Sequence, residues 1–492
     1  MTQIKQQFEF KSIYHEILLV FTVFMAQILC QGSITMALST MDVVLQSFEL
    51  TVPISSVKVW YMGSFALTVG TFILVSGKLG DLFGLKLVFI IGWIWVAFSS
   101  MLCGLTIYSH NIIFLIISRA LQGIGFSLLL PCGMGILGNI YPNGFRKNLA
   151  FSSVGAAGPI GATLGAIMAA VIAEKSWWPW CFFIITFISI SLAILSYIYI
   201  PKNVAELPED KLAKLDILGA FTGITGLVLL NFVLNQGPLI GWGTVYIIVL
   251  LILSVFLIVG FFIIELYFAT FPLLPKSIFN LKIGLVLAAI SLGWGSFGIW
   301  QFYYWVILLE LRHYSAILTA VSYIPVMVLG AIASFLVAVV IHKIRPSYIM
   351  VVSSVGFFVG SVMLAVMPVE QTFWKISFIQ LFIITWGMDL SFAAGSIILS
   401  DYLPKTDQGI AGSLVSTVVN YSVSFFLGMS SSVEAGVKHS THDTLKSYRA
   451  SLYFGIGLSG LGLVISVIFL IWQLYVNDSV FTQEDPEKVD DQ

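Results

Sequence analysis

The sequence predicts an all-α integral membrane protein with fourteen helices that cross a lipid bilayer. Of its 492 residues, 59% are hydrophobic and only 10% are charged, whereas a soluble protein carries about 25% charged residues. The mean hydropathy is +1.00, and apolar runs long enough to span a bilayer recur along the chain. This composition excludes a water-soluble globular protein, because its surface would be too apolar to face water.

Each predicted span is a run of mostly apolar residues between charged or Pro- and Gly-rich breaks. About 20 such residues in a helix cross a hydrocarbon core about 30 Å thick, and a helix satisfies its backbone amides internally. The first run begins only at Ile17 and has no small-residue cleavage site, so we expect a retained helix and not a signal peptide. The fourteen spans are predicted at 17–40, 57–76, 87–107, 111–138, 150–173, 178–200, 217–235, 245–268, 283–309, 316–341, 348–367, 376–399, 409–431 and 451–476.

The distribution of basic residues predicts that both termini are cytoplasmic. Lys and Arg are retained preferentially in short cytoplasmic loops. With the N-terminus inside, roughly two-thirds of the 23 Lys and Arg residues fall in inner segments, and three of the outer ones lie in the single loop 432–450. Aromatic rings that prefer the membrane interface fall at predicted outer helix ends; they are Trp60, Trp177, Trp178, Trp242 and Trp374.

A short internal repeat predicts two halves of the same orientation. At a shift of about 262 residues, the string at 136–142 lies over that at 398–404. Helices 9–14 would then repeat helices 1–6, with helices 7 and 8 inserted, and alternating-access carriers are built from two such bundles. The predicted segments are a cytoplasmic tail at 1–15, an N-terminal six-helix bundle at 16–200, a linker with the inserted helices at 201–268, a C-terminal six-helix bundle at 269–476 and a cytoplasmic tail at 477–492.

Composition and motifs also argue against several kinds of partner. A net charge of −1 leaves no basic surplus to neutralise a nucleic-acid backbone. The four cysteines lie inside apolar runs, so we expect no disulfide, and we expect neither a metal nor a cofactor. A glycine-rich string at 455–460 lies in an apolar helix, where helix packing explains it better than a dinucleotide site.

The predicted inner loop between helices 2 and 3 carries a spaced set of glycines and charges. It reads GKLGDLFGLK over 77–86, which places Gly77, Gly80, Asp81, Gly84 and Lys86. Glycines permit a tight turn, and a carboxylate at a helix start meets backbone N–H groups and nearby cations. The string resembles the signature loop of the major facilitator superfamily, G-x-L-x-D-x-x-G-x-K, which implies a gating loop. An ordinary polar turn is the alternative.

Helix 4 is predicted to carry a buried cation. Arg119 and Gln122 stand in the string RALQGIG at 119–125, within an apolar run. A charge there costs at least about 2.5–3.5 kcal/mol on insertion scales, so it should face the bundle interior and a partner. The string resembles the superfamily's helix 4 motif, R-x-x-Q-G, which implies coupling or substrate binding. A purely structural ion pair is the alternative.

Helix 5 contains small residues around a proline. Gly158, Pro159 and Gly161 stand in the string GAAGPIGATLG at 155–165. Small residues let helices approach closely and proline weakens the local hydrogen-bond ladder, so packing alone could explain the string. Its core resembles the antiporter motif of the drug:proton antiporters, with Ala162 in place of a second glycine.

Asp389 is the most informative single residue. It lies about 13 residues into predicted helix 12, roughly 20 Å below the outer face at 1.5 Å per residue. Burial favours the neutral form of an isolated carboxyl group, which can carry a proton or bind a cation. A static partner of Arg119 is the alternative. Polar side chains expected around this level are Gln27, Gln31, Trp294, Gln301 and Asn420.

Further strings in both halves narrow the resemblance. They lie at 177–180, 235–238, 271–275, 293–300, 386–389 and 418–422. Together they are similar to the fungal fourteen-helix drug:proton antiporters, in the branch that includes the aminotriazole-resistance and boron exporter and the low-affinity ammonium transporter. The resemblance covers about residues 16–476 and does not decide between those substrates.

These observations predict a proton-coupled carrier of a small polar solute that works by alternating access and is not an enzyme. We expect a monomer in the plasma membrane, or in the vacuolar membrane, with lipid, protons and a small-molecule substrate as partners. The runner-up is a low-affinity ammonium transporter in which Asp389 and aromatic residues of helix 9 bind the cation. A nontransporting membrane receptor is the alternative of another class, but the loops are too short for a large signalling domain.

Overall fold

The computed structural model describes residues 12–48, 54–141, 145–202, 204, 215–340, 344–404 and 408–475. In these ranges the chain is almost entirely helical and contains no strand. The helices are α1 (Ile13–Gln46), α2 (Ile54–Phe83), α3 (Leu85–Leu105), η1 (Thr106–Ser109), α4 (Ile112–Ile140), α5 (Phe145–Lys175), α6 (Trp180–Tyr199), α7 (Ile217–Ile240), α8 (Val245–Ile263), η2 (Ile264–Phe268), η3 (Lys276–Ile278), α9 (Leu281–Val306), η4 (Ile307–Leu311), α10 (Ala316–Val321), α11 (Ile324–Val340), α12 (Pro346–Val366), α13 (Ile376–Tyr402), α14 (Gln408–Thr441) and α15 (Thr444–Tyr475).

The predicted fold class is confirmed. Among the described residues, fourteen helical segments are long and apolar enough to cross a membrane. One predicted span is divided, because α10 ends at Val321 and α11 begins at Ile324. Pro325 has no N–H with which to continue the hydrogen-bond ladder at this point, so the helix breaks.

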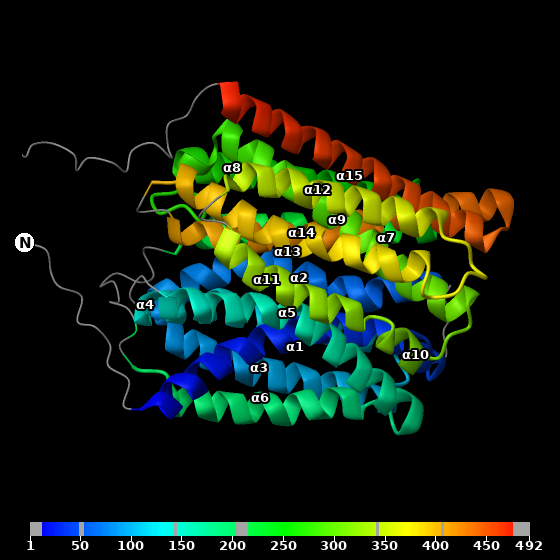
Figure 1. Cartoon of the computed structure of the whole chain (residues 1–492), viewed down its shortest axis with the longest axis horizontal. Coiled ribbons are helices and arrows are strands. Elements are labelled where there is room, and N and C mark those ends of the chain that lie inside the picture. Colours follow the sequence, from blue (N-terminus) through cyan, green and yellow to red (C-terminus); the bar gives the residue numbers. More distant parts are fainter. Residues whose placement is uncertain are drawn as a thin grey trace, which may run out of the picture.

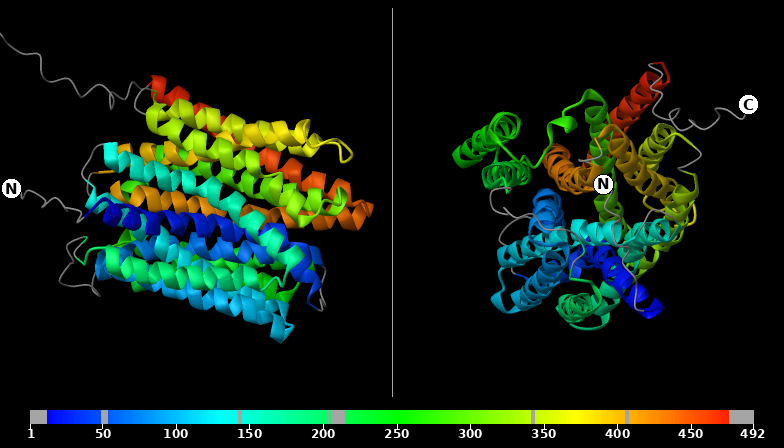
Figure 2. Two further views of the ribbon diagram at one scale, coloured as in Figure 1. Left: turned by 60° about the horizontal axis from the view of Figure 1, so that its bottom comes forward. Right: turned by 90° about the vertical axis from the view of Figure 1, so that its left-hand side faces the viewer.

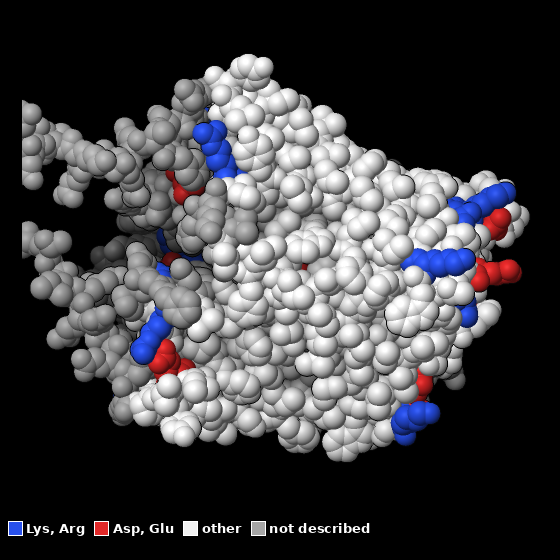
Figure 3. All heavy atoms as spheres, viewed as in Figure 1, with Lys and Arg blue, Asp and Glu red and all other residues white. Residues whose placement is uncertain are grey.

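The helices lie side by side along the long axis of the molecule (Figure 1). The first and last helices both have their chain ends at the left-hand end in that view, which we call the inner end according to the predicted orientation; the opposite end is the outer end. On the face shown in Figure 3, charged side chains gather at these two ends and a wide belt of other residues separates them. That belt matches the hydrocarbon core of a bilayer.

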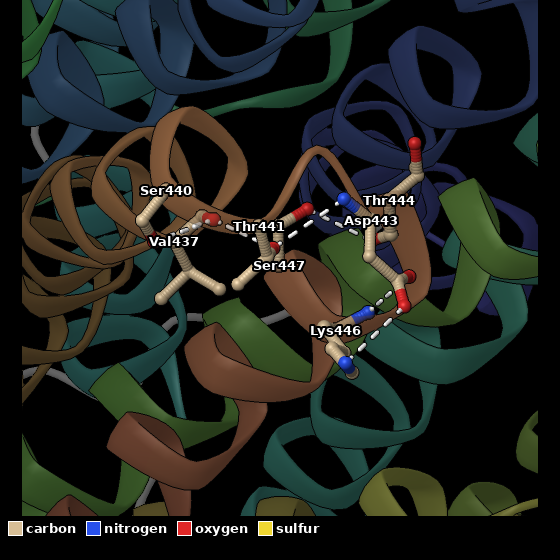
Figure 4. A network of polar contacts seen from close by, with 7 residues as sticks. All are labelled: Val437, Ser440, Thr441, Asp443, Thr444, Lys446 and Ser447. Atoms are coloured by element: carbon tan, nitrogen blue, oxygen red, sulfur yellow. Dashed lines mark hydrogen bonds and ion pairs between the residues drawn. The ribbon is translucent and has the colours of Figure 1, made fainter.

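The predicted outer loop at 432–450 is wrong in its extent. Helix α14 continues to Thr441 and α15 begins at Thr444, so only His442 and Asp443 lie between them. An Asp443 carboxylate oxygen accepts a hydrogen bond from the backbone N–H of Lys446 at 3.0 Å and caps the first turn of α15 (Figure 4). The prediction ended each span where the hydropathy falls, but both helices continue as polar helix beyond that point.

The two halves share three of their main helix contacts, which supports the predicted repeat. In the first half α1 packs on α5, α3 on α4 and α3 on α6. In the second half α9 packs on α14, α12 on α13 and α12 on α15, as the corresponding helices do. The end-on view in Figure 2 places α7 and α8 to one side of the bundle. The residue boundaries given for the segments stay predictions, and most of both tails lies outside the described ranges.

The halves meet along two symmetry-related helix pairs, α2 with α14 and α5 with α11. On α2 the contact is made by Gly63, Gly70 and Gly77, spaced seven residues apart on one face. A Cβ atom on Gly70 would lie only 2.5 Å from the backbone nitrogen of Tyr421, so the helices touch backbone to backbone there. Small residues therefore set the distance between the halves.

The topology can be tested by labelling introduced cysteines from outside intact cells. Ser440 and Lys202 are exposed at opposite ends of the bundle, and all four native cysteines are buried. We expect a membrane-impermeant maleimide to label Ser440→Cys and to reach Lys202→Cys only after the membrane is permeabilised. The reverse pattern would contradict a cytoplasmic N-terminus.

Candidate functional site

Asp389 lies halfway along α13, equally far from Ile376 and Tyr402, which places its carboxyl group near the middle of the membrane. The side chain is partly exposed, but its Oδ2 atom is buried and has no hydrogen-bond partner among the described residues. Buried polar atoms usually have a partner, and an exception marks a candidate site for a proton or a ligand.

Asp389 stands where the two halves touch. A Cβ atom on Gly330 of α11 would lie 2.9 Å from Oδ2 of Asp389 and 2.4 Å from Cβ of Pro159 on α5. The same helix pair meets again one turn inward, where Gly155 lies against Ser334. The proline predicted for an antiporter motif is thus packed against the other half, beside the carboxyl group.

The two glycines of that motif face the opposite way, toward α1. A Cβ atom on Gly161 would lie 2.4 Å from the carbonyl oxygen of Ile28, so this position requires glycine. A Cβ atom on Gly158 would lie 3.6 Å from Nε2 of Gln27 on α1. Helix α5 therefore lies between α1 and α11, with the amide of Gln27 on its α1 side and Asp389 on its α11 side.

Tyr323 and Gln301 lie on the C-terminal side of Asp389. Tyr323, in the break between α10 and α11, interacts electrostatically with Asp389 and receives a hydrogen bond of 3.4 Å from Nε2 of Gln301 on α9. Trp294, also on α9, binds a different face of α13: its Nε1 donates a hydrogen bond of 2.9 Å to Oγ of Ser391, and residues two apart in a helix do not face the same way. Of the aromatic face predicted for helix 9, Trp294 thus contacts α13 away from the carboxyl group.

Arg119 is bound within the N-terminal half and forms no ion pair with Asp389 in this structure. Its guanidinium group donates to Oε1 of Gln122 at 2.5 Å and to the carbonyl oxygen of Ser33 at 2.7 Å. It also lies over the ring of Phe65, 4.7 Å from the ring centroid. The alternative of an Arg119–Asp389 pair is therefore not the arrangement found, because α1 and α4 satisfy the cation locally.

Three other residues that were predicted for the site, Gln122, Asn420 and Gln31, form no contact with Asp389 among those that the structure describes. The amide of Gln122 donates to Ser100 and is buried with Arg119. Asn420 donates to the carbonyl oxygen of Ser416 in its own helix and lies where α14 touches Gly70. Gln31 is partly exposed on α1. The structure thus divides the predicted set into a site at Asp389 and a separate cluster at Arg119.

The predicted gating loop is nearly continuous helix with one sharp break. Gly84 has a φ of 107°, a value that residues with a side chain rarely adopt, and separates α2 from α3. A Cβ atom on Gly80 would lie 2.8 Å from Sγ of Cys132, whereas Gly77 faces Ser413 of the other half. Asp81 is exposed at the inner end of α2.

Lys86 acts locally. Its ammonium group donates to the carbonyl oxygens of Tyr197, at 2.7 Å, and Ile200, at 2.5 Å, at the end of α6. These are carbonyl groups that the helix itself leaves without a partner, and a cation is favourable there. The lysine of the motif therefore ties α3 to α6 within the N-terminal half.

A buried charge cluster joins the two halves at the outer end. Lys58 lies in the outer part of α2 and is only 5% exposed. Its ammonium group binds the carboxylate of Asp42 on α1 and, at 2.5 Å, that of Glu310 in η4. Tyr448 of α15 also donates to Glu310. In this state the outer ends of α2 and α9 are held together.

A second polar contact closes the outer end between α5 and α10. Oε1 of Glu174 accepts a hydrogen bond of 3.0 Å from the backbone N–H of Ile317, in the first turn of α10. A carboxylate is favourable at a helix start. Both outer contacts therefore connect opposite halves.

Comparison with known proteins decides the family. The family model of the Major Facilitator Superfamily matches residues 23–429. The chain belongs to the Major Facilitator Superfamily. The superfamily is one of membrane transporters and not a class of enzymes, and the fourteen apolar helices make the chain a multi-pass membrane protein.

Curated relatives within the superfamily match almost the whole chain. The aminotriazole resistance protein of Saccharomyces cerevisiae is 43% identical over 466 residues, which cover 94% of this chain and 85% of that protein. The low affinity ammonium transporter of the same yeast is 39% identical and covers 95% and 90%. The efflux pump terJ of Aspergillus terreus is 35% identical and covers 94% and 89%. These relatives confirm the branch indicated by the motifs.

Solved structures of major facilitator proteins share the fold. A POT family transporter in complex with 5-aminolevulinic acid superposes with a TM-score of 0.65 at 13% identity, covering 93% of this chain and 96% of that one. A human organic anion transporter superposes with a TM-score of 0.60 at 14% identity, covering 92% and 99%. At such low identity the likeness concerns the fold alone.

Two parts of this major facilitator site were missed by sequence reasoning. Gly330 and Ser334 are four residues apart, opposite Gly155 and Pro159, and this small-x-x-x-small spacing was a signal for helix contact. Lys58 gave no comparable signal, because its partner Glu310 lies 252 residues away. Only the folded chain brings those charges together.

The contact at Gly330 predicts the effect of adding one methyl group. In Gly330→Ala, the new Cβ would overlap Pro159 and press on Asp389, so we expect a loss of about 1–3 kcal/mol of stability, as for other overpacked sites. Gly284→Ala on α9 is the control, since nothing lies within 4 Å of its Cβ position. The check is the thermal unfolding midpoint of the purified protein. Equal midpoints for both variants would show that the halves are not in tight contact here.

Proposed function

We propose that this protein is a proton-coupled secondary transporter of a small polar solute, with Asp389 as the proton-carrying group. The observation that carries the proposal is the unpartnered Oδ2 of a carboxyl group held at mid-membrane, against the contact between the two halves. Burying an ion without a partner is costly, so the carboxyl group favours protonation whenever the site is closed to water.

This placement links protonation to the movement of the halves. The side chain is partly exposed and lies beside Pro159 of the other half. A charged carboxylate disfavours the dry contact with α5, and a neutral one tolerates it. A proton or a cationic substrate that neutralises Asp389 therefore favours closure around the site, which is the coupling that alternating access needs.

The charge pattern of the site favours a small neutral or singly cationic solute. Asp389 contributes one acidic group, Gln301 contributes an uncharged amide next to Tyr323, and Arg119 is occupied elsewhere. An anionic substrate would lack a free cation at this level among the described residues. This agrees with the names of two relatives, an aminotriazole resistance protein and a low affinity ammonium transporter.

An ammonium transporter that works without proton exchange is the second candidate. In it Asp389 would bind the cation directly, and the ring of Tyr323 on the C-terminal side would offer a π face. Drug or boron efflux in exchange for protons is the first candidate because of the antiporter motif at Gly158, Pro159 and Gly161. For either, we propose the plasma membrane, with the vacuolar membrane as the alternative.

The loop at Gly77, Gly80, Asp81, Gly84 and Lys86 would serve this cycle as a gating element. Gly77 contacts Ser413 of the other half, so movement of the halves changes the environment of the inner end of α2. Lys86 keeps α3 and α6 together during the movement. We propose that the protein completes the cycle as a monomer, because each half supplies part of the site.

Replacement of Asp389 tests the coupling. Asp389→Asn keeps the shape of the side chain but cannot titrate, so we expect substrate exchange to persist while accumulation driven by a pH gradient falls at least tenfold. The measurement is transport of labelled methylammonium, boric acid and aminotriazole into proteoliposomes. Asp401→Asn, at the exposed inner end of the same helix, is the matched control and should behave as wild type.

The outcomes separate the two candidates. If exchange of methylammonium is lost together with its binding, Asp389 holds the cation itself. Full pH-driven accumulation in Asp389→Asn would remove both roles.

Replacement of the outer ion pair tests the closed state. Glu310→Gln weakens the attraction to Lys58, so we expect the outer ends of the halves to separate more often and the label distance between Ser109→Cys and Lys375→Cys to increase. Pulsed electron spin resonance would measure it. Asp443→Asn, a change at the outer turn away from the contact, is the control. An unchanged distance in Glu310→Gln would show that the pair does not hold the outer end closed.

A further inference from the structure

The inserted helices α7 and α8 cover the line along which the halves meet at α2 and α14. Helix α7 contacts both of these helices, one from each half, and packs on α8. Helix α8 is largely exposed on the surface: only 11% of the residues in its most apolar stretch are buried. When the halves rearrange, α7 and α8 must therefore move with the N-terminal half, move with the C-terminal half, or move separately from both.

Polar contacts attach α7 to α14. The hydroxyl group of Tyr421 donates to the carbonyl oxygen of Leu227 at 3.1 Å. Oγ of Ser424 lies 3.3 Å from Oδ1 of Asn231, but its one hydroxyl proton has a closer acceptor, at 3.0 Å, in the carbonyl oxygen of Gly63 on α2. Asn231 is fully buried.

One turn further along α7, Asn235 contacts Gly428 of α14. A Cβ atom on Gly428 would lie only 2.5 Å from Nδ2 of Asn235. The glycine thus lets α7 approach α14 closely.

The contact between α7 and α2 is of another kind. It includes the rings of Trp60 and Phe232, whose centroids are 5.7 Å apart. In the described ranges no side chain of α7 forms a hydrogen bond with α2. The polar contact of α2 in this region is with α14: the carbonyl oxygen of Gly63 accepts a hydrogen bond of 3.0 Å from the hydroxyl group of Ser424.

We propose that α7 and α8 move with the C-terminal half as one body, and that α7 slides over α2 during the transport cycle. The inference rests on the proposed alternating access. Polar groups inside the bilayer have no water to replace a lost partner, so the hydrogen bond from Tyr421 of α14 to α7 resists separation. The contact between the rings of Trp60 and Phe232 can shift without leaving a polar group unpaired.

The chain connections support the same assignment independently. Helix α8 is joined to α9 by residues 269–280, and the fully buried Glu265 accepts hydrogen bonds of 3.2 Å from the backbone N–H groups of Leu273 and Leu274 in that segment. Glu265 also lies beside Gly219 at the start of α7. The connection to the N-terminal half, residues 200–216, is longer.

Distance measurements between spin labels test the proposal without a known substrate. Three cysteine pairs at the outer end are labelled in protein reconstituted in liposomes: Ile240→Cys with Lys375→Cys, Ile240→Cys with Ser109→Cys, and Ser109→Cys with Lys375→Cys. All three positions are exposed and lie on α7, the N-terminal half and the C-terminal half. Each pair is measured at acidic and at neutral pH and in the Glu310→Gln background.

We expect the label pair at Ile240 and Ser109, between α7 and the N-terminal half, to show two populations of distances. The same two-population behaviour is expected for the pair at Ser109 and Lys375, between the halves. The pair between α7 and the C-terminal half should keep a single distance throughout. Two populations for α7 against the C-terminal half would overturn the proposal. A single distance in all three pairs would overturn the moving halves of the proposed function, and this inference with it.

A variant of the polar contact gives a second, independent result. In Tyr421→Phe the hydrogen bond to the carbonyl oxygen of Leu227 is lost, so the distance distribution between α7 and the C-terminal half should broaden. Ser254→Ala is the matched control, because Ser254 is buried in α8 and bonds only to Leu251 of its own helix among the described residues. Equal distributions in both variants would overturn the assignment of this contact as the attachment.

Discussion

Each polar group that the chain carries into the hydrocarbon has to find its partner inside the protein, because the bilayer offers none. Arg119 meets this constraint in part with Gln122, a backbone carbonyl group and aromatic rings, all within one half, while its Nε has no partner among the described residues. Lys58 meets it across the halves, with Asp42 and Glu310. Several buried polar atoms of the described residues lack a partner, and Oδ2 of Asp389 is the one that belongs to an acidic group where the halves touch, which makes the residue a candidate for coupling.

Close helix contact is the second requirement, and the glycines of the motifs supply it. Gly161 and Gly158 bring α5 against α1, while Pro159 on another face of the same helix reaches Gly330 of the other half. Residues that look like one chemical motif in the sequence therefore divide into two packing surfaces. The role of the motif is to hold a helix between α1 and α11, beside the carboxyl group.

The outer and inner ends of the halves are held by different forces. Outer contacts involve buried charges and a backbone N–H group, namely Lys58 with Glu310 and Ile317 with Glu174. Farther inward, α2 meets α14 through glycines, in a close contact without charge that includes a hydrogen bond from Ser424 to the carbonyl oxygen of Gly63. Charge pairs depend on a specific geometry and separate at a cost, whereas a smooth glycine face can tolerate a change of angle. This difference suits a transporter in which one end opens about a persistent contact.

Hydrophobic runs and short motifs are local properties of the chain, so the number of spans, the fold class and the family could be predicted from the sequence. It also identified Asp389, since a carboxylate in the middle of an apolar run is conspicuous without any knowledge of its neighbours. It misjudged helix ends such as Thr441, because hydropathy does not report where a polar helix stops. The tertiary structure decided which residues meet: it separated Arg119 from Asp389, placed Gly330 beside the carboxyl group and brought Lys58 to Glu310. Those contacts join segments far apart in the chain, and their partners are chosen by helix packing and by the need to satisfy buried charge.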